Sequence, residues 1–208
     1  MIDYAAFRRL GVSTVYEATG KQGLIGCEFR QLTPGSRAAG PARTVRCGQD
    51  DNLMVHAAIE RIEPGDVVVL TMPEPRPVAL IGELLLTQMM VRKAAAVLCD
   101  AASRDVEELA TMGLPVWTRF VSPRGATKEK VGALDVPVEV GGATINPGDI
   151  VVLDADGACV VAHGDAQRAL QLSEERFGRE ERTRERYRSG ERSYDINDLR
   201  RIVEGAKA

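Results

Sequence analysis

The turn sequence Pro-Gly-Asp occurs twice in the chain, each time directly before a short run of aliphatic, mostly β-branched residues. The first copy, residues 64–66, precedes residues 67–70, and the second, residues 147–149, precedes residues 150–153. Proline presets φ and glycine takes the positive φ of a tight turn, so each copy predicts a turn into a buried strand. Two copies are too few for a solenoid of stacked repeats. The chain is therefore expected to build a sheet that it enters at two similar turns.

Helical patterns alternate with these strands. The predicted helices span residues 2–20, 51–61, 82–93, 105–112 and 165–190, and the first of them is expected to end at Gly20, with Ser13 or Thr14 as a cap. Further strands are predicted at residues 94–99 and 114–117, with two or three more within residues 135–162. Residues 71–81 contain three prolines and predict a loop or an irregular edge. The pattern indicates an α/β or β/β/α arrangement of layers.

The last predicted helix is densely charged. Between residues 174 and 188 it carries five Glu and six Arg. Glu175 with Arg179, and Glu180 with Arg184, are spaced one helical turn apart and are expected to pair. Two interpretations stay open: a solvated helix face, or a helix that reaches across to another subunit.

Composition excludes several classes of protein. A chain of 208 residues fits one domain with a sizeable core. The net charge of -3 and the aromatic content of 4% argue against a nucleic-acid or membrane surface. The four cysteines, at positions 27, 47, 99 and 159, form no CxxC motif, which indicates reduced and mostly buried thiols. We find neither a signal-peptide pattern nor an apolar stretch of membrane-spanning length, so a cytoplasmic location is expected.

Residues 100–105, Asp-Ala-Ala-Ser-Arg-Asp, form the strongest candidate site. They follow a predicted buried strand and precede a short helix, where ligands of open α/β sheets often bind. Arg104 beside Asp105 at a helix start would suit an anion together with a metal ion. The alternative is structural, with Asp105 as a simple helix cap opposite Glu108 and Arg104 as an ordinary surface residue.

Glu83 is a second candidate, in the first turn of an apolar helix after the proline-rich loop. Such loops often form the wall of a site, although the helix dipole alone favours a glutamate there. His56 and His163 lack metal-ligand spacing and are expected to be structural or surface residues. The chain contains no GxGxxG, Walker or GxSxG motif.

Taken in order, the motifs resemble one family over nearly the whole chain, that of the 4-hydroxy-4-methyl-2-oxoglutarate aldolases, whose members share a fold with the regulator of ribonuclease activity A. The GELL and DAASRD blocks are the specific ones, and the Pro-Gly-Asp strands are supportive. The segments that carry the resemblance are STVYEATGKQG, PGSRAAGPARTV, DDNLMVH, GELL, LCDAASRDVEEL, GLPVWTRFVSPRG, VPVEVGGATINPGDIVVLDADGACVV and RERYRSGE.

The resemblance implies a swivelling β/β/α fold: a compact single domain, residues 1–164, with a C-terminal helical extension, residues 165–208, at the subunit interface. It also implies homotrimers or dimers of trimers, with active sites between subunits. The implied cofactor is Mg²⁺ or Mn²⁺, held directly by Asp105, with Glu83 holding a metal-bound water. Glu180 or Glu181 of a neighbouring subunit would complete the site.

The resemblance further implies that Arg104 contacts the carboxylate or ketone oxygen of a pyruvate unit. Gly82, Leu84 and Leu85 would bind the substrate carboxylate through backbone amides. A Schiff-base route would need a pocket lysine, and none of the five lysines, at positions 21, 93, 128, 130 and 207, lies in a segment that indicates a buried pocket. One departure stands out: Ala102 occupies a position that is usually glycine, so its methyl group would crowd the backbone if φ were positive there.

Two functions from different classes follow. The first is a metal-dependent aldolase that cleaves 4-hydroxy-4-methyl-2-oxoglutarate or 4-carboxy-4-hydroxy-2-oxoadipate and decarboxylates oxaloacetate through the same pyruvate enolate. The second is a non-catalytic binding protein of the ribonuclease-regulator type. The complete acidic set and the charged extension favour the enzyme, because fold alone does not decide function.

Overall fold

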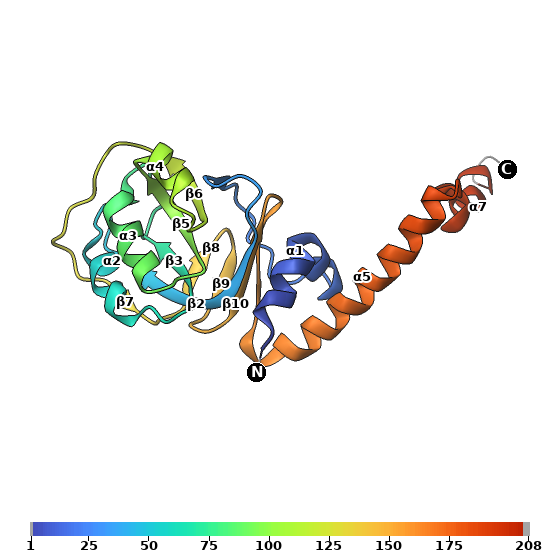
Figure 1. Ribbon diagram of the computed structural model, residues 1–208, viewed down its shortest axis with the longest axis horizontal. Coiled ribbons are helices and arrows are strands. Elements are labelled where there is room, and N and C mark those ends of the chain that lie inside the picture. Colours follow the sequence, from blue (N-terminus) through green and yellow to red (C-terminus); the bar gives the residue numbers. More distant parts are fainter. Residues whose placement is uncertain (1, 206–208) are drawn as a thin grey trace.

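A curled mixed sheet forms the centre of the protein in the computed structural model, which describes residues 2–205 (Figure 1). The strands are β1 Arg30–Gln31, β2 Ala38–Arg46, β3 Val67–Thr71, β4 Ala79–Ile81, β5 Ala96–Ser103, β6 Val116–Val121, β7 Ala133–Leu134, β8 Val138–Val140, β9 Ala143–Ile145, β10 Ile150–Asp154 and β11 Gly157–Val161. The helices are α1 Tyr4–Ala18, α2 Leu53–Ala58, α3 Glu83–Val91, α4 Val106–Thr111, α5 Ala166–Arg188, α6 Ser193–Ile196 and α7 Leu199–Gly205. Single 3-10 turns follow α2 and precede α5.

Strand order in the main sheet is β1-β6-β5-β3-β2-β10-β11, with β4 beside β5 and β7 beside β2. The centre, from β2 to β6, is parallel, and both ends are antiparallel. Both predicted Pro-Gly-Asp entries are confirmed, at β3 and β10. Each aspartate caps its own turn: Asp66 accepts the N–H of Glu63, and Asp149 that of Asn146, both at 2.9 Å.

Two layers cover the sheet, which confirms the β/β/α prediction. Helices α2, α3 and α4 lie on one face over a core that includes Leu70, Leu86 and Leu109 (Figure 1). The β8–β9 hairpin packs on the other face with Trp117, which is 1% exposed. The indole Nε1 of Trp117 donates to the carbonyl of Asp154 at 2.9 Å, so this large side chain is both buried and satisfied.

Helix α1 packs against β10, β11 and the start of α5 around a third apolar cluster. It is kinked at Gly11, whose φ of 79° lies outside the helical region. Asp3 caps the first half, and the carboxylate of Asp154 caps the second by accepting the N–H of Val12 at 2.8 Å. The prediction of a cap at Ser13 or Thr14 is therefore wrong, and the Ser13 hydroxyl donates to Asp156 instead.

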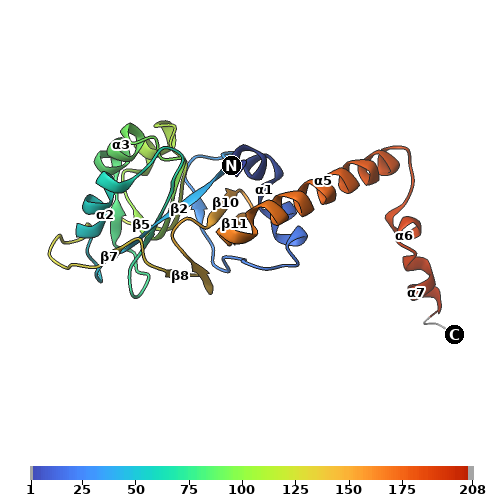
Figure 2. The same cartoon turned by 90° about the horizontal axis from the view of Figure 1, so that it is seen from below.

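Helix α5 leaves the body of the protein as a long arm, followed by α6 and α7 (Figures 1 and 2). Its buried residues, Ala166, Ala169 and Ser173, all lie in its first third. The predicted pairing of its charges is wrong in detail, because Glu180 pairs with Arg176, and Glu181 with Arg184. No helix among residues 2–205 is long and apolar enough to span a membrane.

Strands extend further than predicted around the candidate site. Residues 79–81 lie in the segment predicted as a loop or an irregular edge, and they form β4, which pairs with the end of β5 with a shift in register. Strand β5 continues to Ser103, so Asp100 lies inside it rather than after it. Residues 135–162 hold four strands where two or three were predicted. Ala102 lies in β5 with its φ outside the positive range, so the crowding expected at a positive-φ position does not arise.

Candidate active site

The site lies where the turn between β5 and α4 meets the start of α3. Asp105 Oδ2 accepts the backbone N–H of Glu83 at 3.1 Å. The Nε of Arg104 is 3.6 Å from the same Oδ2 atom, and the N–H of Arg104 donates to the carbonyl of Ile81 at 3.1 Å. The two specific sequence blocks, GELL and DAASRD, are therefore brought together by hydrogen bonds between segments about twenty residues apart.

Asp105 does not cap its own helix. Its backbone is left-handed, with φ 56° and ψ 42°, and its side chain makes no capping bond to α4. This conformation costs an L-residue on the order of 1 kcal/mol, less for aspartate than for most. The structural alternative raised by the sequence is thus wrong for Asp105: its carboxylate is turned away from α4 and towards the start of α3.

A cavity of about 180 Å³ opens beside these groups. Its floor is the first turn of α3, where Gly82 supplies no side-chain cap and the N–H groups have no acceptor within the helix. A partial positive charge at this helix end favours a bound anion. The residues that line it are Asn52, His56, Ala79, Leu80, Ile81, Gly82, Leu84, Leu85, Arg104, Asp105, Ala126 and Lys128.

The absence of a side chain at Gly82 keeps this turn tight. A Cβ built there would lie 2.4 Å from Asp105 Oδ2 and 3.0 Å from Arg104 Cγ. Gly82 is extended, with φ −151°, so the constraint is one of space rather than of backbone conformation. Glycine at this position therefore lets the Arg104–Asp105 turn approach the start of α3.

Glu83 begins α3 and is half-buried, and its carboxylate accepts the hydroxyl of Thr87 one turn along at 3.0 Å. Leu84 is 74% exposed, whereas Leu85 is buried in the core. Both leucines line the cavity. Of the predicted site residues, Gly82, Glu83, Leu84, Leu85, Arg104 and Asp105 are thus brought to one place.

Three further cavity residues were not predicted as site residues. Asn52 and His56 lie at the start and on the next turn of α2, and Lys128 comes from the loop after β6. The spacing of four residues between Asn52 and His56 was a signal that could have placed them on one helix face. Lys128 is exposed in its loop, as expected of a lysine outside a buried-pocket segment, but it borders this open cavity, which nothing local in the sequence indicates. Lys207 lies outside the described residues.

Asn52 presents an unused acceptor. Its side-chain N–H₂ donates to the carbonyl of Leu80 at 3.0 Å, which fixes the amide orientation. Its Oδ1 is buried and has no hydrogen-bond partner among the described residues. Leaving such an atom unpaired costs roughly 1–3 kcal/mol, so a donor from a ligand or a water would be stabilising.

The positive charge of the cavity comes from Arg104 and Lys128 rather than from His56. Burial, and then the positive charge of Lys128, lower the pKa of His56 below its usual value. The imidazole is therefore neutral near pH 7, and Arg104 and Lys128 carry the positive charge of the cavity.

Two groups from the sequence motifs lie elsewhere. Asp100 is buried and pairs with Arg119 at 2.8 Å, and burial raises the pKa of its carboxyl although Arg119 opposes the shift. Its interactions are with Arg119 and not with Asp105. Glu180 and Glu181 lie on the projecting part of α5, paired with arginines of their own helix, and do not reach the cavity of their own chain.

The donor set fits a sparsely coordinated hard cation. Asp105 is 41% exposed at its side chain, and the carboxylate of Glu83 is on the adjoining helix start. Mg²⁺ accepts one or two carboxylates and completes its shell with water and substrate oxygens. Within residues 2–205 of one chain, no three His, Cys, Asp or Glu side chains cluster as a full metal cage.

A larger cavity, about 600 Å³, lies at the junction of α1, β9–β10 and α5. Its buried carboxylate, Asp149, already accepts the N–H groups of Asn146 and His163. The smaller cavity combines a free helix start, an exposed carboxylate, an arginine and an unpaired acceptor. We therefore assign the candidate site to the smaller one.

Comparison with known proteins places the chain in a family. The model of the RraA-like family, described as Aldolase/RraA, matches residues 12–160. This range is most of the chain and contains the whole sheet apart from the end of β11, together with the candidate site. The protein belongs to the RraA-like family.

The relatives carry different names. A Halalkalibacterium halodurans protein that is 29% identical over 170 residues, covering 82% of this chain and 81% of its own, bears the provisional name 4-hydroxy-4-methyl-2-oxoglutarate aldolase. A Streptomyces coelicolor structure, described as an unusual member of the RNase ES inhibitor RraA family, is 28% identical with a TM-score of 0.76 and covers 87% of this chain and 94% of that one.

A third relative bears yet another name. A Geobacillus kaustophilus structure named S-adenosylmethionine:2-dimethylmenaquinone methyltransferase is 30% identical with a TM-score of 0.67, over 72% of this chain and 93% of that one. Three names on one fold mean that the activity has to be argued from the site.

Proposed function

We propose that the protein is a divalent-metal-dependent lyase that cleaves 4-hydroxy-4-methyl-2-oxoglutarate or 4-carboxy-4-hydroxy-2-oxoadipate to pyruvate and a keto-acid, and that also decarboxylates oxaloacetate. The observation that carries the proposal is the meeting of Asp105, Arg104 and the open start of α3 at one cavity. An α-keto acid can be bound by such a set: the carboxylate holds a cation, and the guanidinium and the unpaired N–H groups bind the substrate oxygens.

Asp105 would hold Mg²⁺ or Mn²⁺ directly, and Glu83 would hold it through a water molecule. The bound cation supplies Lewis acidity to the keto group of the substrate. The N–H groups of Leu84 and Leu85, in the first turn of α3 after Gly82, would receive the substrate carboxylate. Arg104 lines the same cavity next to Gly82 and would bind the keto oxygen.

The two activities share one intermediate. In retro-aldol cleavage the C4 hydroxyl loses its proton to a water molecule, a carbonyl forms at C4, and the electrons of the broken C3–C4 bond form the pyruvate enolate. In oxaloacetate the C3–C4 bond breaks with loss of carbon dioxide and leaves the same enolate. Arg104 stabilises the enolate oxygen, and protonation at C3 gives pyruvate. Asn52 Oδ1, which has no hydrogen-bond partner among the described residues, would accept a hydrogen bond from the C4 hydroxyl.

A neighbouring subunit would complete the site. We propose that the extension, residues 165–208, forms the subunit interface of a homotrimer or dimer of trimers. Glu180 or Glu181 would enter the neighbour's cavity from it. The support is that α5 projects from the body with only its first third buried (Figure 2). Isolated, mostly exposed helices of this kind gain their stability from packing.

The second candidate is a binding protein of the ribonuclease-regulator type. The name of the Streptomyces coelicolor relative supports it, and so do Leu84 and Val91, which are 74% and 75% exposed on α3. Leu84 lines the cavity and Val91 ends the same helix, and exposed apolar side chains on one helix would suit a partner surface, although single exposed leucines are common. The assembled acidic and basic groups of the cavity favour the enzyme.

The first experiment measures pyruvate release from 4-hydroxy-4-methyl-2-oxoglutarate and from oxaloacetate, with Mg²⁺ and with EDTA. Release is expected with Mg²⁺ and is expected to stop with EDTA. Arg104→Ala should lower kcat/KM at least 100-fold, since one donor to an oxyanion contributes about that much. Arg8→Ala, which removes an exposed arginine of α1 far from the cavity, is the matched control and should retain full activity.

Failure of a folded, Mg²⁺-loaded sample to release pyruvate from either substrate would contradict the lyase proposal and favour the binding protein. Metal-dependent release that survives Arg104→Ala would support a lyase but contradict the site. The ratio of the two wild-type rates would identify the preferred substrate.

A further inference from the structure

The loop between β6 and β7, residues 122–132, forms one wall of the cavity without any helix or strand of its own. It is the long excursion beside α2 in Figure 1. Ala126 and Lys128 line the cavity from this loop. A loop of this length needs fixed anchors if it is to present a side chain to a ligand, because a free loop would lose conformational entropy on each binding event.

Asp51 is the main anchor. Its Oδ2 accepts the hydroxyl of Thr127 at 2.6 Å, the N–H of Glu129 at 2.7 Å and the N–H of Lys130 at 3.1 Å. These three donors stand on both sides of Lys128. The other oxygen, Oδ1, accepts the N–H of Leu53 at the start of α2. One carboxylate thus joins the helix that carries His56 to the loop that carries Lys128.

The anchor is buried and rigid. Asp51 is 0% exposed, and no cation pairs with it within residues 2–205. Burial alone would raise the pKa of Asp51, but hydrogen bonds from Thr127, Glu129, Leu53 and Lys130 outweigh it and lower the pKa to about 2. The carboxylate therefore stays ionised throughout the neutral range, and each bond to it is charge-assisted.

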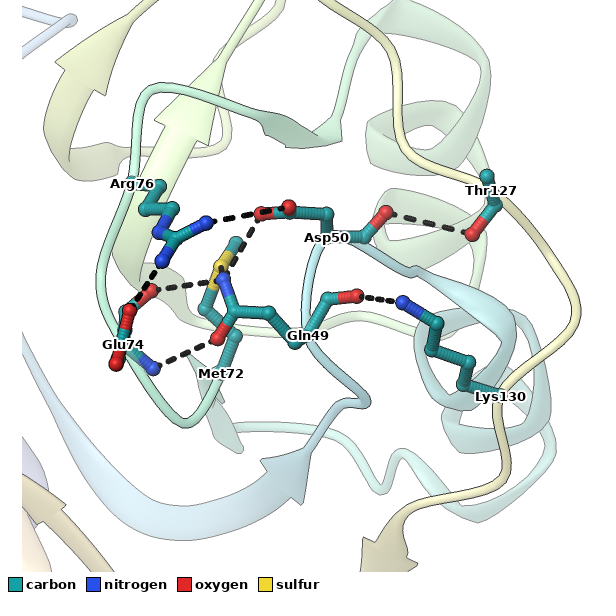
Figure 3. A network of polar contacts seen from close by, with 7 residues as sticks. All are labelled: Gln49, Asp50, Met72, Glu74, Arg76, Thr127 and Lys130. Carbon is teal, nitrogen blue, oxygen red and sulfur yellow. Dashed lines mark hydrogen bonds and ion pairs between the residues drawn. The ribbon is translucent and has the colours of Figure 1, made fainter.

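Neighbouring residues extend the attachment (Figure 3). The ammonium group of Lys130 donates to the carbonyl of Gln49 at 2.7 Å. Backbone bonds run from Thr127 to Asp50 at 3.0 Å, and from Asn52 to Thr127 at 2.9 Å. In contrast, the side chain of Lys128 lines the cavity and makes none of these hydrogen bonds. The framework therefore fixes the backbone on both sides of Lys128 and leaves its ammonium group for a ligand.

We propose that Asp51 is a positioning residue that holds Lys128 over the cavity, so that Lys128 binds the carboxylate of the substrate farthest from the reacting ketone. The inference rests on the proposed lyase function. It follows from the geometry that Arg104 and the start of α3 serve the pyruvate unit, while Lys128 and His56 lie on the α2 side of the same cavity. Asp51 would act on binding and not on the chemical step.

The test is Asp51→Asn, which keeps the size of the side chain but offers an N–H₂ group to backbone donors. Two reactions are compared: cleavage of 4-hydroxy-4-methyl-2-oxoglutarate, whose distal C5 carboxylate stays intact in the second product, and exchange of the C3 protons of pyruvate in D₂O, which lacks that carboxylate. We expect KM for 4-hydroxy-4-methyl-2-oxoglutarate to rise about tenfold with kcat within about twofold, and KM for pyruvate exchange to change less than about twofold.

Two substitutions of Thr127, to Val and to Ser, provide a second test in case Asp51→Asn does not fold. Thr127 is exposed, so changing it leaves the core intact. Removing the hydroxyl should raise KM for 4-hydroxy-4-methyl-2-oxoglutarate about threefold, and keeping it as serine should restore the wild-type value. Asp149→Asn alters another buried carboxylate that accepts backbone N–H groups, far from the cavity, and should leave both KM values unchanged.

Hydrogen exchange at Glu129 and Lys130 supplies a readout that does not need activity, and it should speed up in Asp51→Asn. Faster exchange with an unchanged KM for 4-hydroxy-4-methyl-2-oxoglutarate would overturn the positioning role, as would equal rises in both KM values. If the wild-type protein turned over neither compound, the lyase proposal would fail, while exchange would still report whether Asp51 holds the loop.

Discussion

One carboxylate oxygen of Asp105, Oδ2, makes two contacts. It accepts a hydrogen bond from the N–H of Glu83 and lies close to the guanidinium of Arg104. Its other oxygen makes no hydrogen bond among the described residues and remains for a ligand. Because the backbone of Asp105 is left-handed, the carboxylate is directed across to α3 rather than along α4. A backbone conformation that costs free energy and directs a functional group is a common property of active sites.

Gly82→Ala tests this arrangement without changing any polar group. The new methyl group would meet Asp105 Oδ2 at 2.4 Å, so the Arg104–Asp105 turn must move away from α3. A displacement of this size at reacting groups costs on the order of 100-fold in kcat/KM. The measurement is pyruvate release with Mg²⁺, together with a thermal melt to show that the fold survives.

Gly205→Ala is the control for a glycine whose Cβ would meet nothing within 4 Å, and it should behave as wild type. A Gly82→Ala protein with full activity would show that the close approach of the two segments is irrelevant to turnover.

At the scale of elements, the kink of α1 connects the helix to the sheet. Gly11 has a φ of 79°, and its Cα lies so close to Asp154 that a Cβ would meet Oδ2 at 2.7 Å. That oxygen caps the second half of α1 through the N–H of Val12. The kink therefore depends on glycine for both conformation and space.

Gly11→Ala is expected to destabilise the protein by about 3 kcal/mol, since it adds backbone strain and disrupts a buried hydrogen bond to a carboxylate. For a chain of this size that is a fall in Tm of roughly 6–12 °C. Gly35→Ala has almost the same φ, 78°, with nothing near its Cβ, and should cost only the strain, about 1 kcal/mol. Equal melting temperatures for the two variants would show that the Asp154 contact contributes nothing.

Elements with strong local signals were predicted from sequence, and the others were not. The Pro-Gly-Asp turns located β3 and β10, and the long polar helix α5 was found nearly to the residue. For residues 71–81 the sequence left a loop and an irregular edge open, and it could not place β4 beside β5 because that pairing is made across the sheet. β5 was predicted to end too early because Asp100 looks like a strand end, whereas Arg119 pairs with it inside the sheet.

The candidate site divides in the same way. Glu83, Arg104 and Asp105 stand in recognisable blocks, but Asn52, His56 and Lys128 gain their place from tertiary contacts alone. The anchor at Asp51 joins residues more than 70 positions apart, a relation that no local pattern carries. The sequence therefore predicted the acidic and basic groups of the site, but not the α2 and loop residues that line the rest of the cavity.

At the scale of the whole molecule, the arm formed by α5 to α7 carries exposed apolar residues: Leu199, Ile202 and Val203 are 40%, 64% and 50% exposed. Its charged glutamates cannot reach the cavity of their own chain. If the proposed assembly is correct, each active site combines groups from two chains, and symmetry repeats the arrangement around a ring.

Mixing inactive variants tests the shared site. Asp105→Asn alone and the double variant Glu180→Gln/Glu181→Gln should each lose activity. Co-refolding equal amounts should restore activity at about a quarter of the sites, because an intact site needs Asp105 from one chain and the glutamate from its neighbour. The measurement is pyruvate release before and after mixing. No recovery in an assembly shown to contain both chains would mean that the glutamates act in their own chain or not at all.

The single tryptophan lies on the far side of the sheet from all these groups. Trp117 is fixed by the Asp154 carbonyl and surrounded by apolar side chains, so its fluorescence depends on the one junction where β6, β10 and the hairpin meet. The fluorescence of Trp117 therefore reports on the packing of this junction, and Trp117 does not line the cavity. A change in its emission indicates that the body of the molecule has unfolded. Substitutions of Arg104 or Asp105 that keep the fold should leave the emission unchanged.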